Sequence, residues 1–138
     1  MAMKLVVMGP GGVGGYFGAR LAAADNDVTT RGPIGPVRAH PQSQPLLEVA
    51  VREAVAVGIA QGARLQPADA DAIITAIDGL HPAMMASMCH DLLAHKPLEL
   101  AGLSGALVHL GASTGVPGPT HTFITQALSP FADGKPSL

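Results

Sequence analysis

The stretch LLEVAVREAVAVGIAQ, residues Leu46–Gln61, decides the fold, because its apolar residues recur at the spacing of one helix face. Gly62 follows directly, at the kind of position where helices end. The residues that define the apolar face are Leu47, Val51, Ala54, Val55 and Ile59. We therefore expect this stretch to be an amphipathic helix with one side buried in a core.

Prolines divide the rest of the chain into further helical segments, since proline is tolerated in the first turn of a helix. The prolines and the segments that they precede are Pro67 with about Ala68–Leu80, Pro82 with about Ala83–His95, Pro97 with about Glu99–Thr114, and Pro119 with about Thr120–Leu128. No strand pattern occurs after Leu46, so residues 46–138 are expected to form an all-helical domain. Residues 32–45 contain four prolines and are expected to be a linker.

The N-terminal residues predict a different kind of unit. Lys4–Met8 (KLVVM) is a short apolar run rich in β-branched residues, which is typical of a buried strand. Gly9–Gly15 is a glycine-rich turn, Tyr16–Ala24 has a helical composition, and Val28–Thr30 could begin a second strand. Residues 1–31 are therefore expected to form a short β-α-(β) unit, and the chain as a whole is expected to be mostly α.

The glycine turn carries a pattern with a specific physical use. Gly9, Gly11 and Gly14 form G-x-G-x-x-G, with Gly12 and Val13 between the second and third glycines. Such a turn lets the backbone approach a pyrophosphate at the positive end of a helix. A Rossmann-type dinucleotide site is therefore predicted, and a glycine-rich loop without a ligand is the alternative.

The end of the second predicted strand indicates which dinucleotide would bind. An acidic residue there would bind the ribose hydroxyls of NAD, whereas an arginine suits the extra phosphate of NADP. The residues at this point are Thr29, Thr30 and Arg31, with no acid among them. This favours NADP with Arg31 as a cofactor residue; the alternative is that Arg31 is a solvated charge of the linker.

The composition excludes several classes of function. The chain of 138 residues is 48% apolar with a net charge of −2, and its basic residues form no cluster of the kind that binds nucleic acid. The single cysteine, Cys89, rules out an intramolecular disulfide and fits a reducing compartment. No apolar run approaches a membrane span, and the six histidines show no metal-ligand spacing. We expect a cytoplasmic protein without a metal site.

Two parts of the chain resemble the ketopantoate reductase (2-dehydropantoate 2-reductase) family. Met3–Thr29 is similar to the family's opening strand, glycine turn and helix. Ser87–Glu99 (SMCHDLLAHKPLE) and the Gly-Val-Pro-x-Pro pattern at Gly115–Pro119 are similar to its second, helical domain. The resemblance implies a remnant of an NADP-binding Rossmann domain over 1–31 and a helical substrate and dimerisation domain over 46–138. The order of these parts agrees with the family, but their spacing predicts an internally shortened chain.

The resemblance also implies a reaction and residue roles. The family reduces the keto acid 2-dehydropantoate to pantoate with NADPH, in pantothenate biosynthesis, and a lysine protonates the developing alkoxide. Ser87 would hydrogen-bond the substrate, and Glu99 would act as the catalytic residue that orients either the substrate's hydroxyl or the lysine. The family's lysine has no counterpart here, and Ser104 stands where the family commonly has asparagine. An impaired reductase is therefore expected; the alternative is an inactive remnant that acts as a helical oligomerisation or binding module.

Both residues also have simpler interpretations. Ser87 could be an ordinary helix hydroxyl whose hydrogen bond is local. Glu99 could be a first-turn charge favoured by the helix dipole. Their spacing within the resembling stretch favours the functional interpretation.

The predicted N-terminal strand implies a partner chain. A lone strand at Lys4–Met8 would leave N–H and C=O groups unpaired on both edges. Pairing with the same segment of a second copy, or packing on an exposed helical surface, would rescue the unit. We therefore expect a homo-oligomer with residues 1–31 at the contact, or aggregation in its absence.

Overall fold

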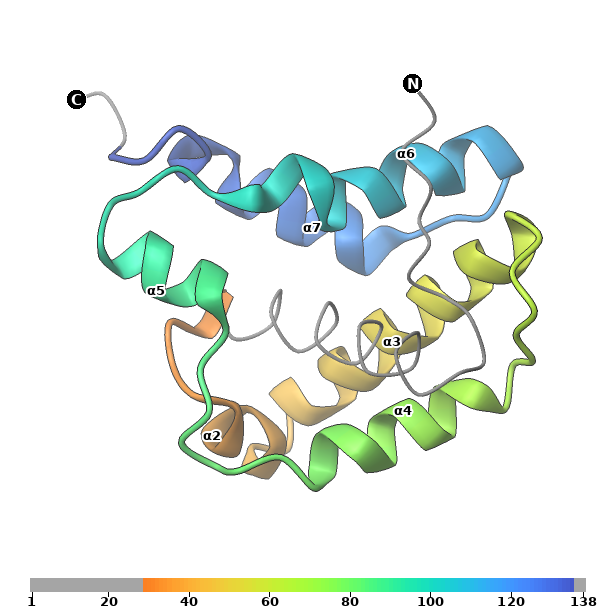
Figure 1. Cartoon of the computed structure of the whole chain (residues 1–138), viewed down its shortest axis with the longest axis horizontal. Coiled ribbons are helices and arrows are strands. Elements are labelled where there is room, and N and C mark those ends of the chain that lie inside the picture. The colour runs from red at the N-terminus through yellow and green to blue at the C-terminus, as the bar shows by residue number, and fades with distance from the viewer. Residues whose placement is uncertain (1–28, 136–138) are drawn as a thin grey trace.

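The computed structural model describes residues 29–135, and all of its regular elements there are helical (Figure 1). In chain order they are α2 (Ile34–Ala39), α3 (Ser43–Ala60), α4 (Asp69–Asp78), α5 (Ser87–Leu93), the 3₁₀ turn η1 (Glu99–Gly102), α6 (Ser104–Thr114), α7 (Pro119–Leu128) and the 3₁₀ turn η2 (Ser129–Phe131). The prediction of an all-helical unit after Leu46 is confirmed. The strand at Lys4–Met8, the glycine turn and the helix at Tyr16–Ala24 lie outside the described residues.

Helix α3 lies in the middle of the unit and packs against α2, α4, α6 and α7 (Figure 1). Its two sides enter different apolar clusters, which explains the wide apolar face of the sequence. The α2–α3–α4 cluster consists of Ile34, Val37, Leu47, Val51, Val55, Ala70, Ile73 and Ile77. The α3–α6 cluster consists of Ala54, Val57 and Leu107. Burial on both sides makes α3 the scaffold on which the other helices are placed.

A third group of buried residues, the α5–α7 cluster, is formed by side chains of α5, η1 and α7. Its members are Met88, Cys89, Leu92, Leu100, Ile124 and Leu128. Half-buried residues on either side of η1, in η2 and in the segment before α5 pack against it, among them Met85, Leu98 and Phe131. This cluster joins α5 and η1 to α7, and so places the two segments that carry Ser87 and Glu99.

Helix α2 lies inside the segment 32–45 that the sequence predicts as a linker, so that expectation is wrong for these residues. The prolines mislead because Pro36 stands in the first turn, where its missing N–H group costs no helical hydrogen bond. The free amides of this turn are satisfied by tertiary contacts: Ile34 N donates to Met84 O at 2.9 Å and Gly35 N donates to Pro82 O at 2.9 Å. Ile34 and Val37 are buried, so α2 belongs to the helical core.

Three other boundaries differ from the expectation. The predicted helix over Ala83–His95 begins only at Ser87, because the residues before it pair with α2. The predicted helix over Glu99–Thr114 is broken at Leu103, which allows both Leu100 and Leu103 to reach the α5–α7 cluster. Thr29 and Thr30 are helical rather than the start of a strand. Within residues 29–135, no helix is long and apolar enough to cross a membrane.

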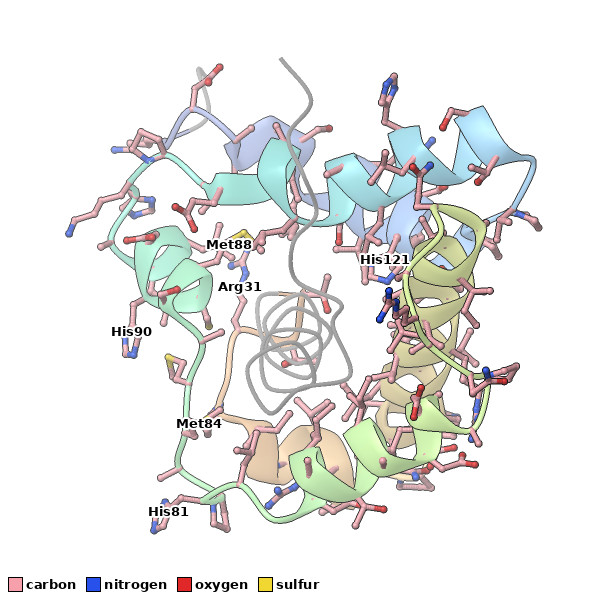
Figure 2. The ribbon with its side chains drawn as sticks, turned by 45° about the vertical axis from the view of Figure 1, so that its right-hand side comes forward. Arg31, His81, Met84, Met88, His90 and His121 are labelled. Carbon is pink, nitrogen blue, oxygen red and sulfur yellow. The ribbon has the colours of Figure 1, made fainter. Side chains whose placement is uncertain are left out.

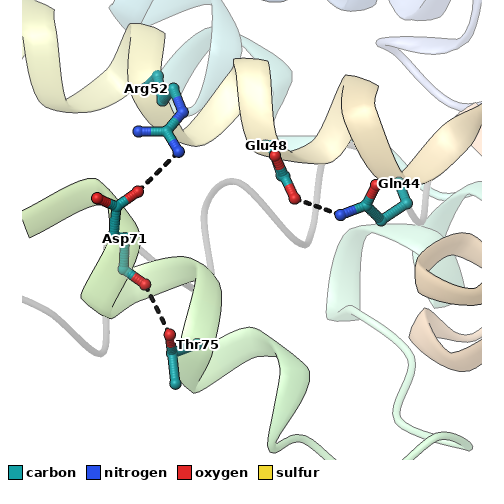
Figure 3. Close-up of polar contacts among 5 residues, drawn as sticks. All are labelled: Gln44, Glu48, Arg52, Asp71 and Thr75. Atoms are coloured by element: carbon teal, nitrogen blue, oxygen red, sulfur yellow. Dashed lines mark hydrogen bonds and ion pairs between the residues drawn. The ribbon is translucent and has the colours of Figure 1, made fainter.

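Polar contacts on the outer side of α3 and α4 add little to this packing (Figure 3). Arg52 forms an ion pair with Asp71 at 2.7 Å, and Thr75 Oγ1 donates to the Asp71 carbonyl at 2.9 Å. Both members of the ion pair are exposed, so it contributes at most about 1 kcal/mol. Arg38 is more closely integrated, because its guanidinium donates to Asp78 O, at the end of α4, and to Leu80 O, just after it, at 2.9 Å each. It therefore ties the end of α4 to α2.

The contact between α2 and Pro82 gives a stability prediction. A Cβ atom at Gly35 would lie 2.8 Å from Pro82 Cβ and 2.8 Å from Pro82 O, closer than real contacts allow. Gly35→Ala should therefore destabilise the chain by about 1–3 kcal/mol despite the better helix propensity of alanine. Thermal unfolding followed by circular dichroism measures this. Gly102→Ala is the matched control, because a Cβ there meets nothing within 4 Å; equal effects of the two variants would contradict the prediction.

Candidate functional site

Ser87 and Glu99 each stand at the first residue of a helical element, Ser87 in α5 and Glu99 in η1. Both side chains are exposed, while the residues that follow them, Met88 and Leu100, are buried in the α5–α7 cluster. Among the described residues, neither side chain has a hydrogen-bond partner. The fold therefore presents a hydroxyl and a carboxylate to solvent around a single apolar cluster.

Arg31 lies beside the same cluster. Its Cζ atom is 5.6 Å from the centroid of the Phe131 ring, a cation–π distance, and Phe131 packs against the α5–α7 cluster. Figure 2 shows Arg31 extending toward the part of the molecule that holds Met88. The backbone of Arg31 is left-handed, with φ 56°, which few residues other than glycine adopt. The remaining predicted cofactor residues, Gly9, Gly11, Gly12, Val13 and Gly14, lie outside the described residues.

The end of the described chain holds the segment that leads into Glu99. Leu98 N donates to Ala132 O at 2.8 Å, just after Phe131. Gly134 has φ 104°, and a Cβ there would lie 2.8 Å from His95 O. Only glycine allows both this backbone conformation and this approach. The η2 turn and the residues after it thus fix the chain on the N-terminal side of Glu99.

Glu53 is a buried carboxylate that sequence reasoning missed. It is 9% exposed, yet Oε1 accepts a hydrogen bond from Thr120 N at 2.9 Å and Oε2 accepts one from His121 N at 3.1 Å. These are free amides in the first turn of α7, where the helix dipole also favours a negative charge. The available signal was a glutamate three residues after Ala50 and four before Val57, on the buried side of α3.

His121 is the second buried polar residue of this network, at 1% exposure. Its Nε2 lies 2.9 Å from Ala50 O, and its Nδ1 lies 3.0 Å from Ser104 Oγ. A carbonyl only accepts, so Nε2 carries the hydrogen of that contact. Ser104, the residue that departs from the family pattern, thus contacts a buried imidazole. Within residues 29–135, no group of three or more histidine, cysteine, aspartate or glutamate side chains could hold a metal ion.

The Gly-Val-Pro-x-Pro pattern builds the turn between α6 and α7. Gly115 ends α6 in a left-handed conformation with φ 72°, and Val116 N donates to Gly111 O at 2.9 Å. Pro119 occupies the first position of α7. The turn therefore accounts for Gly115, Val116 and Pro119 of this pattern.

An open apolar groove of ≈ 730 Å³ lies between α6 and α7 beside this turn. It is lined mainly by Val108, Val116, Pro117, Pro119, Thr122 and Phe123, and the Phe123 side chain is 58% exposed. Phe123 thus adds an exposed aromatic ring to the apolar lining of the groove.

The sequence matches the family model described as ketopantoate reductase PanE/ApbA C terminal over residues 25–132. It is also 33% identical to a 2-dehydropantoate 2-reductase from Caulobacter vibrioides over 82 residues, 59% of this chain. The present chain spans only 28% of the length of that relative.

Solved structures share the helical fold. A dimeric ketopantoate reductase from Staphylococcus aureus matches 86% of this chain and 41% of its own, with a TM-score of 0.79 and 19% identity. A ketopantoate reductase from Ralstonia eutropha matches 87% of this chain and 41% of its own, with a TM-score of 0.72 and 23% identity. A D-mandelate dehydrogenase in a ternary structure with NADH and anilino(oxo)acetate matches 87% and 69%, with a TM-score of 0.72 and 16% identity.

The Glu53 network gives the second prediction. Glu53→Ala leaves the buried amides of Thr120 and His121 without an acceptor, which should cost about 3 kcal/mol of stability. Glu53→Gln retains a single acceptor oxygen and should lose roughly half of that. Chemical denaturation measures both values. Glu48→Ala on the same helix is the control: it removes only the i, i+4 hydrogen bond from Gln44 and should change stability by about 0.5 kcal/mol or less; a Glu53→Ala effect no larger than this would contradict the assignment.

Proposed function

The chain belongs to the ketopantoate reductase family, and we propose that its helical unit is the substrate-binding half of a 2-dehydropantoate 2-reductase. The observation that carries the proposal is the placement of Ser87 and Glu99, exposed at two helix starts around one apolar cluster. Both residues come from the stretch that resembles the family. A hydroxyl and a carboxylate in this arrangement suit a small acid that also bears hydroxyl groups.

In this proposal Ser87 donates a hydrogen bond to the keto acid, and Glu99 accepts one from its terminal hydroxyl. The carboxylate of Glu99 can take this hydrogen bond because no described group already occupies it. Such contacts would hold the ketone carbon in one orientation toward the hydride donor. Holding the reacting groups in this geometry is how positioning raises the rate. The D-mandelate dehydrogenase neighbour was solved with an oxoacetate, which supports 2-oxo acids as the substrate class.

NADPH, when bound, supplies the hydride that reduces the ketone. The residues proposed to hold it are the glycines at 9, 11, 12 and 14, Val13 and Arg31, on the remnant over 1–31. A full dinucleotide-binding domain needs on the order of 100 or more residues, so we expect this remnant to bind NADPH weakly. The proposed division is then a cofactor remnant over 1–31 and a helical domain over 46–138, with residues 32–45, which hold α2 and the start of α3, packed into the same helical core.

The proposal includes impaired catalysis. The chain contains three lysines, Lys4, Lys96 and Lys135, and none stands in the context of the family's proton-donating lysine. Without a positioned acid, the alkoxide that forms on hydride transfer must take its proton from water. A positioned acid contributes about 10²–10⁴ in rate, so the chain lacks at least that factor.

The reductase prediction follows from these points. The purified chain, with its intact mass verified, should oxidise NADPH in the presence of 2-dehydropantoate at least ~10²-fold more slowly than a full-length reductase assayed in parallel. Any residual rate should fall further in Glu99→Gln, and Glu48→Gln should leave it unchanged. A rate equal to that of the full-length enzyme would refute impairment, and a rate insensitive to Glu99→Gln would refute the role of this carboxylate.

A second candidate function is self-association as a helical oligomerisation module. The observation that favours it is Phe123, which stands exposed at the apolar groove between α6 and α7. The S. aureus neighbour is dimeric, which supports a homo-oligomer for this chain as well. In this proposal the groove takes the same surface of a second copy, in addition to the contact predicted for residues 1–31.

Light scattering coupled to size exclusion tests the second candidate. The chain should elute as a dimer or larger species, and Phe123→Ser should shift it toward the monomer, because the change removes apolar area from the contact. Leu93→Ser is the control, since Leu93 is similarly exposed but lies on α5 and does not line the groove. A monomeric parent chain, or the same shift in both variants, would contradict a contact at the groove.

A further inference from the structure

We propose that Arg31 binds the carboxylate of the keto acid, rather than only a cofactor phosphate. This inference rests on the proposed function, because it assigns one residue to one group of the proposed substrate. The substrate class carries an obligatory carboxylate, while Glu99 takes its terminal hydroxyl and Ser87 supplies one uncharged donor, so neither residue offers a positive charge. Arg31, beside the same cluster, supplies the positive charge that would pair with this carboxylate.

The position of Arg31 connects it to Glu99 through a short series of contacts. The guanidinium lies over the Phe131 ring, with Cζ at 5.6 Å from the centroid. The next residue, Ala132, accepts a hydrogen bond from Leu98 N at 2.8 Å, and Leu98 directly precedes Glu99. Phe131 and Leu98 both pack on the α5–α7 cluster, whose Met88 follows Ser87 in the chain. Arg31, Ser87 and Glu99 therefore surround one cluster.

The charge of Arg31 is available for a ligand. Among residues 29–135 the ion pair joins Arg52 and Asp71, and Arg31 has no carboxylate partner there. A guanidinium at cation–π distance from a ring keeps its charge, and its planar fork of N–H groups matches the two oxygens of a carboxylate. The Phe131 ring thus orients the group without neutralising it.

The backbone supports a functional reason for arginine at this position. The left-handed conformation of Arg31 favours glycine or asparagine, and a longer side chain there costs on the order of 1 kcal/mol. An arginine in a left-handed conformation, with its guanidinium over Phe131 beside the α5–α7 cluster, fits a role in binding an anion.

Pantoate and pantolactone make a matched pair of probes, because the lactone lacks the free carboxylate but retains the carbon skeleton. Calorimetric or NMR titration of the full chain should show tighter binding of pantoate than of pantolactone. Arg31→Asn, which keeps a residue that tolerates the left-handed turn, should weaken pantoate binding by roughly tenfold and leave pantolactone binding unchanged. Arg31→Lys should lie between, since it keeps the charge but loses the planar stack.

Arg64→Asn is the control, because Arg64 is exposed in the connection between α3 and α4, and it should change neither affinity. Circular dichroism should show that both asparagine variants retain the helical fold. Equal pantoate affinity in the parent chain and in Arg31→Asn would overturn the assignment of Arg31 but leave the proposed function standing. If Arg31→Asn lost NADPH binding and kept pantoate binding, Arg31 would instead bind the cofactor phosphate. A parent chain that does not bind pantoate would overturn the proposed function, and this inference with it.

Discussion

The contact between the Glu53 carboxylate and the first turn of α7 determines where the other parts of the helical unit lie. Each carboxylate oxygen accepts a hydrogen bond from one of the amides that the start of α7 leaves unpaired. The first turn of α7 is therefore held against the middle of α3. From that point α7 extends Ile124 and Leu128 into the α5–α7 cluster. The cluster in turn underlies the helix starts that carry Ser87 and Glu99, so the candidate site depends on a carboxylate on a different helix.

A buried carboxylate is a costly way to join two helices, and this one is acceptable because its hydrogen bonds are made. Unpaired polar groups in an apolar interior cost several kilocalories per mole, whereas paired ones specify one arrangement. His121 strengthens that specificity, since its Nε2 contacts Ala50 O on α3 and its Nδ1 contacts Ser104 Oγ on α6. A slide of α7 along α3 by one turn would break these contacts together. The network therefore selects the register in which Leu128 and Ile124 meet α5 and η1.

The sequence allowed the helices with the strongest local signals to be predicted, and failed where tertiary contacts decide. Helices α3, α4 and α7 follow from apolar spacing, proline starts and a glycine stop, all of which are local. Helix α2 could not be found this way, because its first amides are satisfied by carbonyls at Pro82 and Met84, more than 40 residues away. Glu53 has the same difficulty, since the amides that it accepts lie 67 and 68 residues further along the chain. Ser87 and Glu99 were identified through a family resemblance, and periodicity gave no sign of them.

The residues that carry the family resemblance divide into two kinds once their contacts are known. Gly115, Val116 and Pro119 form the α6–α7 turn, and a turn of this geometry needs them whatever the protein does. Ser104 is explained equally well by its contact with the His121 ring, since a small hydroxyl leaves room for a buried imidazole. Ser87 and Glu99 are different, because they are exposed and their side chains support no described element of the fold. A resemblance in the turn and packing residues bears on the fold alone. The reaction proposed for this chain therefore rests on Ser87 and Glu99, together with the guanidinium of Arg31 beside the same cluster.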